Sequence, residues 1–398
     1  MIEEREVIIV GGGPAGSSVA NVLASLGHDV LLLDKSRFPR PKPCSEYMSP
    51  GILPLLSNLG IDADLSGMHM LKGMRIHTPA GSQITIEYVD EHNGRYYAPT
   101  MERHVFDKML LDHAARKGVE VRYQAKVMSV VSQDNYSTLR VQLPDRAQMD
   151  IRTKLVIGAD GLRSVVARNL SRRYPLIWPK RMGLVTHINL PGIDADYGDM
   201  YVHPWGYCGV AATGKSSASV GIVLDLRRMA LTRGREAIFE DSLKLFPKAH
   251  KQIFGAASFD RIMGISPIGH GVKEVHGRNW ALVGDAAGFF DPFTGEGIYK
   301  AVKGGILLGE VVSPYLKVGR IKEGLERYAT ERARVFRRKS LLVYLIQIFI
   351  SYPYMLEYVA NKLQDREALR LSLSRGIGDL QDPLYNLNLR FLFGLLRP

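Results

Sequence analysis

The stretch 7–34 limits the possible folds of this chain more than any other part of the sequence. It reads as strand, glycine turn, helix and second strand, the order in which proteins hold a dinucleotide. The turn places Gly11, Gly13 and Gly16 at the G-x-G-x-x-G spacing. Gly11 permits the sharp turn out of the strand, Gly13 lets the backbone approach a pyrophosphate, and Gly16 lets the helix pack closely on the strand. The helix N-terminus then faces the phosphates.

The second half of this unit predicts which dinucleotide is bound. The helix at 17–26 carries apolar residues at three- and four-residue spacing, and Gly27 follows it where a left-handed C-cap belongs. The strand at 30–33 is wholly apolar, as in a buried parallel sheet, and ends on Asp34. A carboxylate there accepts the two hydroxyls of an adenosine ribose and repels a 2′-phosphate. The site therefore suits FAD or NAD better than NADP.

Two further apolar strands are expected to end beside the same ligand. The strand at 155–157 leads into a GADG segment that contains Asp160, and the strand at 280–283 leads into Gly-Asp with Asp285. Ligands sit at the carboxyl ends of parallel strands. Downstream, 295–297 (GEG) opens a long helix, whose free N–H groups and positive dipole end suit the edge of an anionic flavin ring.

Other segments depart from the parallel α/β pattern. Residues 74–88 read as a hairpin and 183–224 as a largely antiparallel sheet, while the chain after Gly319 reads as helical. The predicted fold class is α/β, with a discontinuous Rossmann-like FAD-binding domain, an inserted, mostly antiparallel β substrate domain and a helical C-terminal region. The predicted boundaries are 1–72, 98–180 and 270–330 for the FAD-binding domain, 73–97 and 181–269 for the substrate domain, and 331–398 for the C-terminal region.

Composition excludes several classes of function. The two cysteines, Cys44 and Cys208, form no C-x-x-C, so neither a disulfide framework nor a metal site is expected. Residues 1–5 are short and charged rather than an apolar secretory signal, which favours the cytoplasm. The net charge of +12 favours anionic partners, but no nucleic-acid motif accompanies the basic runs. We expect no nucleic-acid binding, a solvated basic surface or a peripheral membrane contact, and a monomer or small homo-oligomer.

Residues 341–356 (LLVYLIQIFISYPYML) form the most apolar segment after the last motif. The run is short for a membrane span and contains Gln347, Ser351 and Pro353. It is interpreted as a helix that covers the substrate cavity. The alternative is an interfacial membrane contact, because the basic run 337–339 lies beside it.

The three strand-end motifs together resemble the glutathione-reductase-like FAD superfamily, and within it most closely the geranylgeranyl reductase family. That family is similar in turn to aromatic-ring flavin hydroxylases and flavin-dependent halogenases. The resemblance covers nearly the whole chain and implies non-covalent FAD. It implies that Arg103 leans on the phosphate region, that Asp160 supports a strand end and that Asp285 bonds the ribityl chain. Plainer roles stay open, namely helix caps for the two aspartates and a surface position for Arg103.

The full set of expected cofactor-binding residues spans all three motifs. These residues are Gly11, Gly13, Pro14, Ala15, Gly16, Asp34, Lys35, Cys44, Arg103, Asp160, Gly284, Asp285, Pro292, Gly295, Gly297 and Ile298.

The sequence departs from the family pattern at two places. Cys44 matches the P-C-G element beside the flavin, but Ser45 stands where those enzymes usually have glycine. In the stretch that begins at Gly206, Gly209 replaces the tryptophan of the family G-Y-x-W segment and Ala212 replaces its proline. The substrate shape is therefore expected to differ. The same segment lacks the W-x-W-x-I-P run of the halogenases, which argues against halogenation.

The leading prediction is an FAD-dependent oxidoreductase that reduces carbon-carbon double bonds of a lipophilic, isoprenoid-like substrate. Cys44 and Tyr207 are the candidate catalytic acids, and the alternative for Cys44 is a small buried hydrophobe. The alternative function is an FAD-dependent monooxygenase that hydroxylates an aromatic or polyketide substrate with NAD(P)H and oxygen. A third class, an electron relay, would need an exposed flavin edge. No second glycine turn follows a later strand, so NAD(P)H or a reduced ferredoxin is expected to visit as a transient electron donor.

Overall fold

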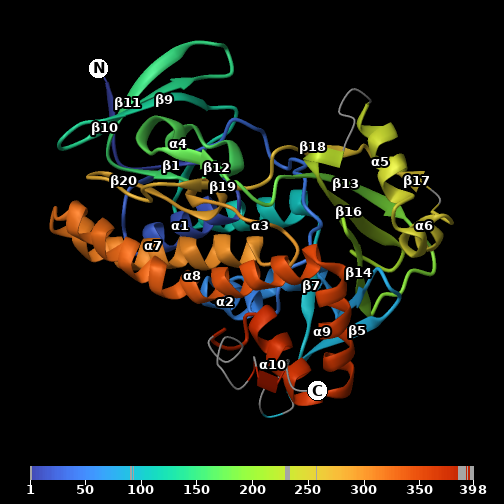
Figure 1. The fold of residues 1–398 in the computed structure, drawn as a ribbon. Coiled ribbons are helices and arrows are strands. Elements are labelled where there is room, and N and C mark those ends of the chain that lie inside the picture. The colour runs from blue at the N-terminus through green and yellow to red at the C-terminus, as the bar shows by residue number, and fades with distance from the viewer. Residues whose placement is uncertain are drawn as a thin grey trace.

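The computed structural model describes residues 2–89, 92, 94–228, 234–256, 258–383, 391, 393 and 394. Two large sheets and a group of C-terminal helices make up most of this part of the chain (Figure 1). The α/β class with a helical C-terminal region, predicted from the sequence, is confirmed.

The first sheet has seven strands in the order β8-β2-β1-β11-β10-β9, with β20 paired to β11. The pairings from β8 through β11 to β20 are parallel, whereas β10 and β9 form an antiparallel extension. The strands are β1 (Glu3–Val10), β2 (Val30–Leu33), β8 (Glu120–Arg122), β9 (Lys126–Ser132), β10 (Ser137–Gln142), β11 (Gln148–Gly158) and β20 (Trp280–Leu282).

The predicted dinucleotide-binding unit lies at the centre of this sheet. Its helix, α1 (Pro14–Ser25), begins at Pro14 rather than at Ser17 as predicted, because proline is well suited to the first turn of a helix. A Cβ on Gly16 would lie 1.9 Å from the carbonyl oxygen of Gly11, so α1 can start this close to β1 only with glycine. Gly27 has a φ of +85°, in agreement with the predicted C-cap.

Helices cover both faces of the first sheet. Side chains of α1, α3 (Arg103–Arg116) and α7 (Gly297–Lys317) share one buried cluster with β1 and β2, and α4 (Val165–Leu170) packs on the other face. Two glycines bring α7 unusually close to α1. A Cβ on Gly305 would lie 2.7 Å from the Ala15 carbonyl oxygen, and one on Gly309 would lie 2.7 Å from Val22 Cγ1.

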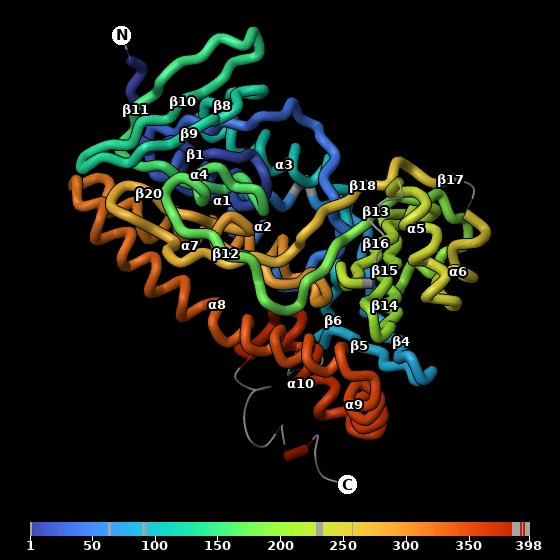
Figure 2. Tube along the Cα trace, turned by 45° about the horizontal axis from the view of Figure 1, so that its top comes forward, coloured from blue at the N-terminus to red at the C-terminus, as the bar shows by residue number. Residues whose placement is uncertain are grey.

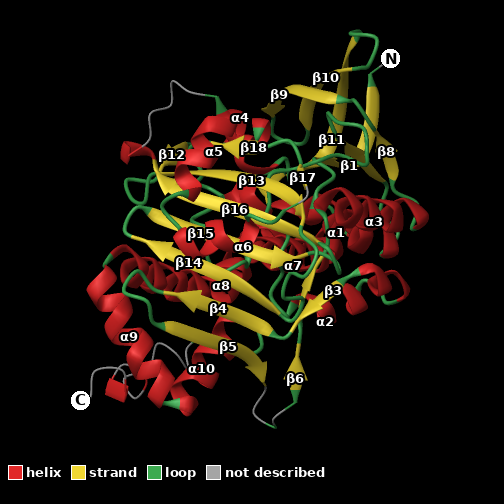
Figure 3. Ribbon diagram, turned by 90° about the vertical axis from the view of Figure 1, so that its right-hand side faces the viewer, coloured by secondary structure: helices red, strands yellow, loops and turns green. Residues whose placement is uncertain are grey.

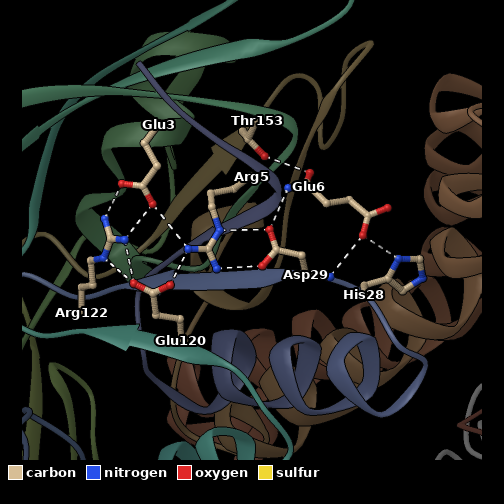
Figure 4. A network of polar contacts seen from close by, with 8 residues as sticks. All are labelled: Glu3, Arg5, Glu6, His28, Asp29, Glu120, Arg122 and Thr153. Carbon is tan, nitrogen blue, oxygen red and sulfur yellow. Dashed lines mark hydrogen bonds and ion pairs between the residues drawn. The ribbon is translucent and has the colours of Figure 1, made fainter. Parts of the chain in front are cut away.

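A network of charged residues surrounds the amino end of β1 (Figure 4). Arg5 Nη2 lies 2.7 Å from Asp29, which directly precedes β2, and Arg5 also bonds Glu120 of β8. Arg122 Nη2 lies 2.7 Å from Glu3. Because these side chains are partly exposed, each pair contributes little to stability on its own. The network joins three neighbouring strands, and the glycine turn lies at the other end of β1.

The second sheet has nine strands in the order β17-β13-β16-β15-β14-β4-β5-β6, with β18 paired to β13 (Figure 3). Its pairings are antiparallel except for the parallel pair β14–β4. The predicted hairpin is β4 and β5. The strands are β4 (Gly73–His77), β5 (Gln83–Val89), β6 (Arg95–Tyr96), β13 (Arg181–Asn189), β14 (Tyr197–His203), β15 (Gly206–Ala212), β16 (Ser217–Asp225), β17 (Ser258–Phe259) and β18 (Met263–Ile265).

Smaller elements connect the two sheets. The boundaries given in the sequence analysis for the FAD-binding domain, the substrate domain and the C-terminal region remain a prediction. The remaining elements before the C-terminal region are α2 (Ile52–Asn58), η1 (Ala63–Gly67), the pair β3 (His69–Leu71) and β7 (Ala98–Thr100), η2 (Gly161–Arg163), the pair β12 (Arg173–Pro175) and β19 (His270–Val272), η3 (Leu226–Arg228), α5 (Arg235–Leu243), α6 (Pro247–Ile253) and η4 (Gly284–Ala287).

Within its described residues, the C-terminal region contains α8 (Ile321–Ser351), α9 (Pro353–Asp365) and α10 (Glu367–Ile377), drawn in orange to red in Figure 2. The helix direction bends by 112° between α8 and α9, because Tyr352 is extended and Pro353 starts a new helix. Within the described residues, no single helix is long and apolar enough to cross a membrane. The α8–α9 pair passes that test only when its two bent halves are taken together.

Candidate active site

A cavity of about 1290 Å³ lies between the two sheets. Its walls come from the glycine turn, the loop between β2 and α2, the inner strands of the second sheet and the start of α7. Segments far apart in the sequence therefore build one site. The predicted site residues that line it are Gly13, Pro14, Ala15, Cys44, Arg103, Tyr207, Asp285, Pro292, Gly295, Gly297 and Ile298.

The end of the cavity beside α1 suits a pyrophosphate. Gly13 is the N-cap of α1 and offers no side chain to the first N–H groups of the helix, so these donors are available to a ligand. A Cβ on Gly13 would meet only the Arg40 guanidinium, at 3.7 Å. Gly11 and Gly16 do not line the cavity. They shape the turn, since a Cβ on Gly11 would lie 2.6 Å from the Ala159 carbonyl oxygen.

Asp34 holds the glycine turn in place. Its Oδ2 accepts a hydrogen bond from the Gly12 N–H and its Oδ1 accepts one from the Ser36 N–H, each at 2.8 Å. Each carboxylate oxygen has a second lone pair, so the side chain retains acceptor capacity for ribose hydroxyls. That role stays a prediction. The neighbouring Lys35 is exposed and does not line the cavity.

Three cations gather in and beside the middle of the cavity. Arg103 donates to both oxygens of Asp107 at 2.7 and 2.9 Å, and Arg40 Nη1 lies 3.3 Å from the same carboxylate. The alternative that Arg103 is a surface residue is wrong, because only 5% of it is exposed. Lys42 Nζ lies 3.8 Å from Asp285 Oδ2, and burial and repulsion by Arg103 lower the pKa of Lys42. An anionic ligand between these cations would relieve this repulsion.

The two aspartates of the later motifs occupy different positions. Asp285 lies within η4 and lines the cavity, and no side chain caps that element. The alternative that Asp285 is a helix cap is therefore wrong. Asp160 instead accepts the Val165 N–H through Oδ2 at 2.6 Å, at the start of α4, and it does not line the cavity. Burial raises the pKa of Asp160.

The start of α7 forms another wall. Gly295 has a φ of +67°, and a Cβ there would lie 2.3 Å from the ring of Tyr47, so glycine is required on both grounds. Glu296 is the N-cap of α7, and its side chain makes no capping hydrogen bond. The first N–H groups of α7 are thus available at the cavity, as predicted. Gly284 has a φ of +61° and contacts Ala15 rather than the cavity.

The two candidate acids both line the cavity. Cys44 Sγ accepts the Glu46 N–H at 3.4 Å and lies beside the Arg103 guanidinium. The hydroxyl of Tyr207, on β15, donates to Asp291 Oδ1 at 2.7 Å. Burial, and then the Asp291 charge, raise the pKa of Tyr207 well above its usual value. Tyr207 therefore holds its proton throughout the physiological range.

Several lining residues are absent from the set predicted from the sequence. Lys42 lies in the basic, proline-rich loop, whose charge suggests phosphate contacts. Met200, Val223 and Ile265 lie on strands of the second sheet, where apolar side chains look the same whether they face a core or a cavity. These three residues reach the cavity because their strands pair within the second sheet, and the local sequence does not reveal that pairing.

Two apolar cavities extend the site toward the C-terminal helices. The first, of about 630 Å³, shares Ser45, Tyr47 and Gly209 with the large cavity. The second, of about 730 Å³, shares Ile86 and Phe293 with the first. The second cavity is lined by apolar side chains from β4, β5 and the three C-terminal helices, and six of these belong to the apolar segment 341–356. Those six are Leu342, Leu345, Ile346, Phe349, Ile350 and Leu356.

The residues that line the large cavity suit the pyrophosphate and ribityl parts of FAD. It offers uncapped helix N–H groups and cations for the pyrophosphate, and the Asp285 carboxylate as an acceptor for ribityl hydroxyls. The cavity is also lined by Gly183, Gly209 and Gly221, which lie on strands of the second sheet. The residues present therefore suit the charged and the hydroxyl-bearing parts of the cofactor.

The comparisons with known proteins agree with this geometry. Residues 4–340 match the FAD binding domain family. The digeranylgeranylglycerophospholipid reductase of Methanosarcina acetivorans is 29% identical over 406 residues, covering 98% of this chain and 95% of that protein. Digeranylgeranylglycerophospholipid reductase 1 of Methanothermobacter thermautotrophicus is 30% identical over 333 residues, covering 80% and 79%.

Solved structures show the same fold. The flavin-dependent brominase Bmp2 has a TM-score of 0.84 at 18% identity, covering 99% of this chain and 100% of that one. A geranylgeranyl bacteriochlorophyll reductase-like protein from Thermoplasma acidophilum has a TM-score of 0.78 at 23% identity, covering 96% and 100%. The chain is therefore an FAD-dependent oxidoreductase. It belongs to the geranylgeranyl reductase family.

Proposed function

We propose that this protein reduces carbon-carbon double bonds of a long isoprenoid chain. The observation that carries the proposal is a series of three neighbouring cavities that share lining residues. The series leads from the FAD site to the C-terminal helices, and its far end is lined by apolar side chains alone. Such an apolar passage matches a long hydrocarbon. The relatives named as digeranylgeranylglycerophospholipid reductases support this substrate class.

Gly209 keeps the passage open. It lines both the large cavity and the first apolar cavity, where a Cβ would already meet Met200 Cε at 3.4 Å. A tryptophan at this position, as in the family pattern, would fill the connection. The departure found in the sequence thus favours a substrate that reaches past β15.

The protein's own groups bind the substrate and supply a proton. FAD, when bound and reduced, supplies the hydride that such a reduction needs. The apolar walls hold the double bond away from water, while Cys44 or Tyr207 gives the proton that the second carbon takes up. The electron donor is NAD(P)H or a reduced ferredoxin.

A peripheral membrane contact would bring the lipid to this passage. Tyr352, Tyr354, Met355 and Tyr358 are exposed at and after the α8–α9 bend, and Tyr354 is 92% exposed. Tyrosines are favoured at membrane interfaces, where one end of the ring is apolar and the other is wet. Leu356, between them in sequence, lines the far apolar cavity. We therefore place the proposed entrance for lipid beside this bend.

The experiment that tests the function separates reduction from oxygenation. The FAD-loaded protein is reduced with dithionite and incubated with a geranylgeranyl lipid, with and without oxygen, and products are identified by mass spectrometry. We expect products that gain two hydrogen atoms per double bond without oxygen. Products that form only with oxygen and contain an added oxygen atom would establish the monooxygenase alternative instead.

A further inference from the structure

A separate pocket of about 740 Å³, lined by both apolar and polar side chains, borders the active-site cavity. Leu162 and Ile265 line both spaces, so the two adjoin at these residues. The pocket is lined by residues of η2, β18 and the short β12–β19 pair. Arg163 and Arg173 are among its lining residues, and none of the described residues that line it is acidic.

Two nitrogen atoms in this pocket are buried without a hydrogen-bond partner among the residues that the structure describes. They are Arg173 Nε and His270 Nε2. Arg173 Nη2 donates to the Leu162 carbonyl oxygen at 2.6 Å, which fixes the guanidinium and leaves Nε unused. His270 is only 6% exposed, and its backbone is fixed by paired hydrogen bonds with Phe289. Buried polar groups without partners are uncommon, and a ligand that supplies acceptors removes their desolvation cost.

The charge in the pocket favours an anion. Burial, and then repulsion by Arg168, lower the pKa of Arg173, and the guanidinium stays protonated at neutral pH. Burial, and then the charge of Arg173, lower the pKa of His270 to about 4, so His270 is neutral there. One fixed cation and one neutral ring nitrogen match the acceptor oxygens of a phosphate group.

The shape of the pocket indicates what carries that phosphate. The ring of Tyr174 lies over Gly271, where a Cβ would be 2.4 Å from Cζ, and Tyr174 is 48% exposed. The ring thus offers a surface on which a flat heterocycle can stack. A protein carrier would reach only the rim, whereas the unpaired nitrogens are buried.

We propose that this pocket binds a phosphate group of a nicotinamide nucleotide through Arg173 and His270, with its heterocycle against Tyr174. The inference rests on the proposed function, because it names the electron donor of that reaction. The nicotinamide C–H bond breaks with loss of a hydride, which carries both electrons, and the nucleotide leaves oxidised. FAD, when bound in the adjoining cavity, would accept this hydride. In this proposal, side chains bind the phosphate of the nucleotide. No second glycine turn follows a later strand in the sequence, so no backbone turn of that kind is available for this role.

The test measures nucleotide binding to the FAD-loaded protein. Dissociation constants for NADH, NADPH and the redox-inactive ADP-ribose are obtained by calorimetry for the unsubstituted protein and for Arg173→Gln and His270→Ala. The matched control is Arg172→Gln, because Arg172 is exposed, adjacent in sequence and absent from the pocket lining. FAD content is measured for each variant from its absorbance.

We expect at least one reduced nucleotide to bind. Arg173→Gln should weaken it by about tenfold or more, the usual effect of losing a charged hydrogen bond, while the control binds normally. His270→Ala should weaken it less. No binding of either reduced nucleotide, or equal binding in Arg173→Gln and the control, would overturn the proposal. Failure of the dithionite-reduced protein to reduce isoprenoid lipid, with nucleotide binding intact, would instead count against the proposed function alone.

Discussion

The hydroxyl of Tyr207 donates to Asp291 Oδ1 at 2.7 Å, and Asp291 in turn holds elements from three parts of the chain. Arg181 of β13 donates to Asp291 Oδ2 at 2.7 Å, and Gln347 of α8 donates to Oδ1 at 2.6 Å. All four side chains are buried. The phenolic proton of Tyr207 is thus already engaged with a carboxylate, which leaves Cys44 as the less constrained candidate acid.

Cys44→Ser should therefore retain FAD and its reduction while forming product about 10²-fold more slowly, the usual scale for losing a general acid. Flavin reduction and product formation are measured separately by stopped-flow absorbance and mass spectrometry. Tyr207→Phe serves as the comparison, because it keeps the ring and removes only the hydroxyl. Unimpaired product formation in Cys44→Ser would transfer the role to Tyr207.

Asp285→Ala should weaken FAD binding by about tenfold or more, because a charged hydrogen bond contributes about 1.5 to 3 kcal/mol. The loss also leaves Lys42 without its nearest carboxylate. FAD affinity is measured by fluorescence titration of the apoprotein. Glu310→Ala is the control, since Glu310 is exposed on α7 and away from the cavity. Equal affinity in both variants would exclude Asp285 from the cofactor site.

Ile377→Trp should reduce the maximum chain length of the substrates that the protein accepts. Ile377 lines both apolar cavities, so a larger side chain there narrows the junction between them. We expect kcat/KM to fall for a geranylgeranyl lipid and to change little for a short prenyl analogue, with FAD content unchanged. Leu341→Trp is the control, because Leu341 is 49% exposed and lines neither cavity. An equal loss for both substrates would show general damage rather than a length filter.

Replacing Tyr352, Tyr354 and Met355 together by serine should reduce sedimentation with anionic liposomes. These side chains are exposed at the α8–α9 bend, and transfer of each from water into an interface is favourable. FAD content and reduction of a detergent-dispersed substrate report on folding. The control is Phe254→Ser, because Phe254 is 80% exposed and follows α6, far from the bend in sequence. Liposome binding that survives the triple replacement would assign the contact to another surface.

Asp199→Asn should destabilise the second sheet in a pH-dependent manner. Asp199 is buried, although hydrogen bonds from His77 and Arg75 outweigh that burial and lower its pKa. Its contribution is then fully present above the unfolded pKa of about 3.9 and is lost as the pH falls through the folded value. Breaking such a pair costs about 3 kcal/mol or more. The unfolding free energies of Asp199→Asn and of the unsubstituted protein are measured with urea. The difference between them should be constant from pH 7 to about pH 5 and should become smaller below pH 4.

The sequence predicted the elements whose signals are local. The glycine spacing with Asp34, and the two Gly-Asp-type strand ends, predicted both the first sheet and the cofactor. The hairpin around residues 79–82 followed from its turn residues. Each of these patterns lies within a few residues of the structure that it specifies, which is why it could be interpreted without knowing the fold.

Features that depend on contacts between distant segments could not be predicted. Nothing near Asp160 distinguishes a residue that lines a cavity from one that anchors α4, because the difference lies in which way the chain turns after β11. The apolar segment 341–356 admitted two interpretations, and the membrane contact stays a prediction. Leu342 and Ile346 line the far cavity, while Tyr352 and Tyr354 are exposed.

The close contact between α1 and α7 joins two helices that are made at widely separated times during synthesis. The helix that faces the pyrophosphate is made first, but Gly305 and Gly309 of its packing partner leave the ribosome only after three quarters of the chain. β20 and Asp285 are made only slightly earlier. A nascent chain that ends before β20 lacks Asp285 and the start of α7, and the apolar face of α1 that packs on α7 stays uncovered. The two halves of the FAD site are therefore present together only after α7 has begun to be synthesised.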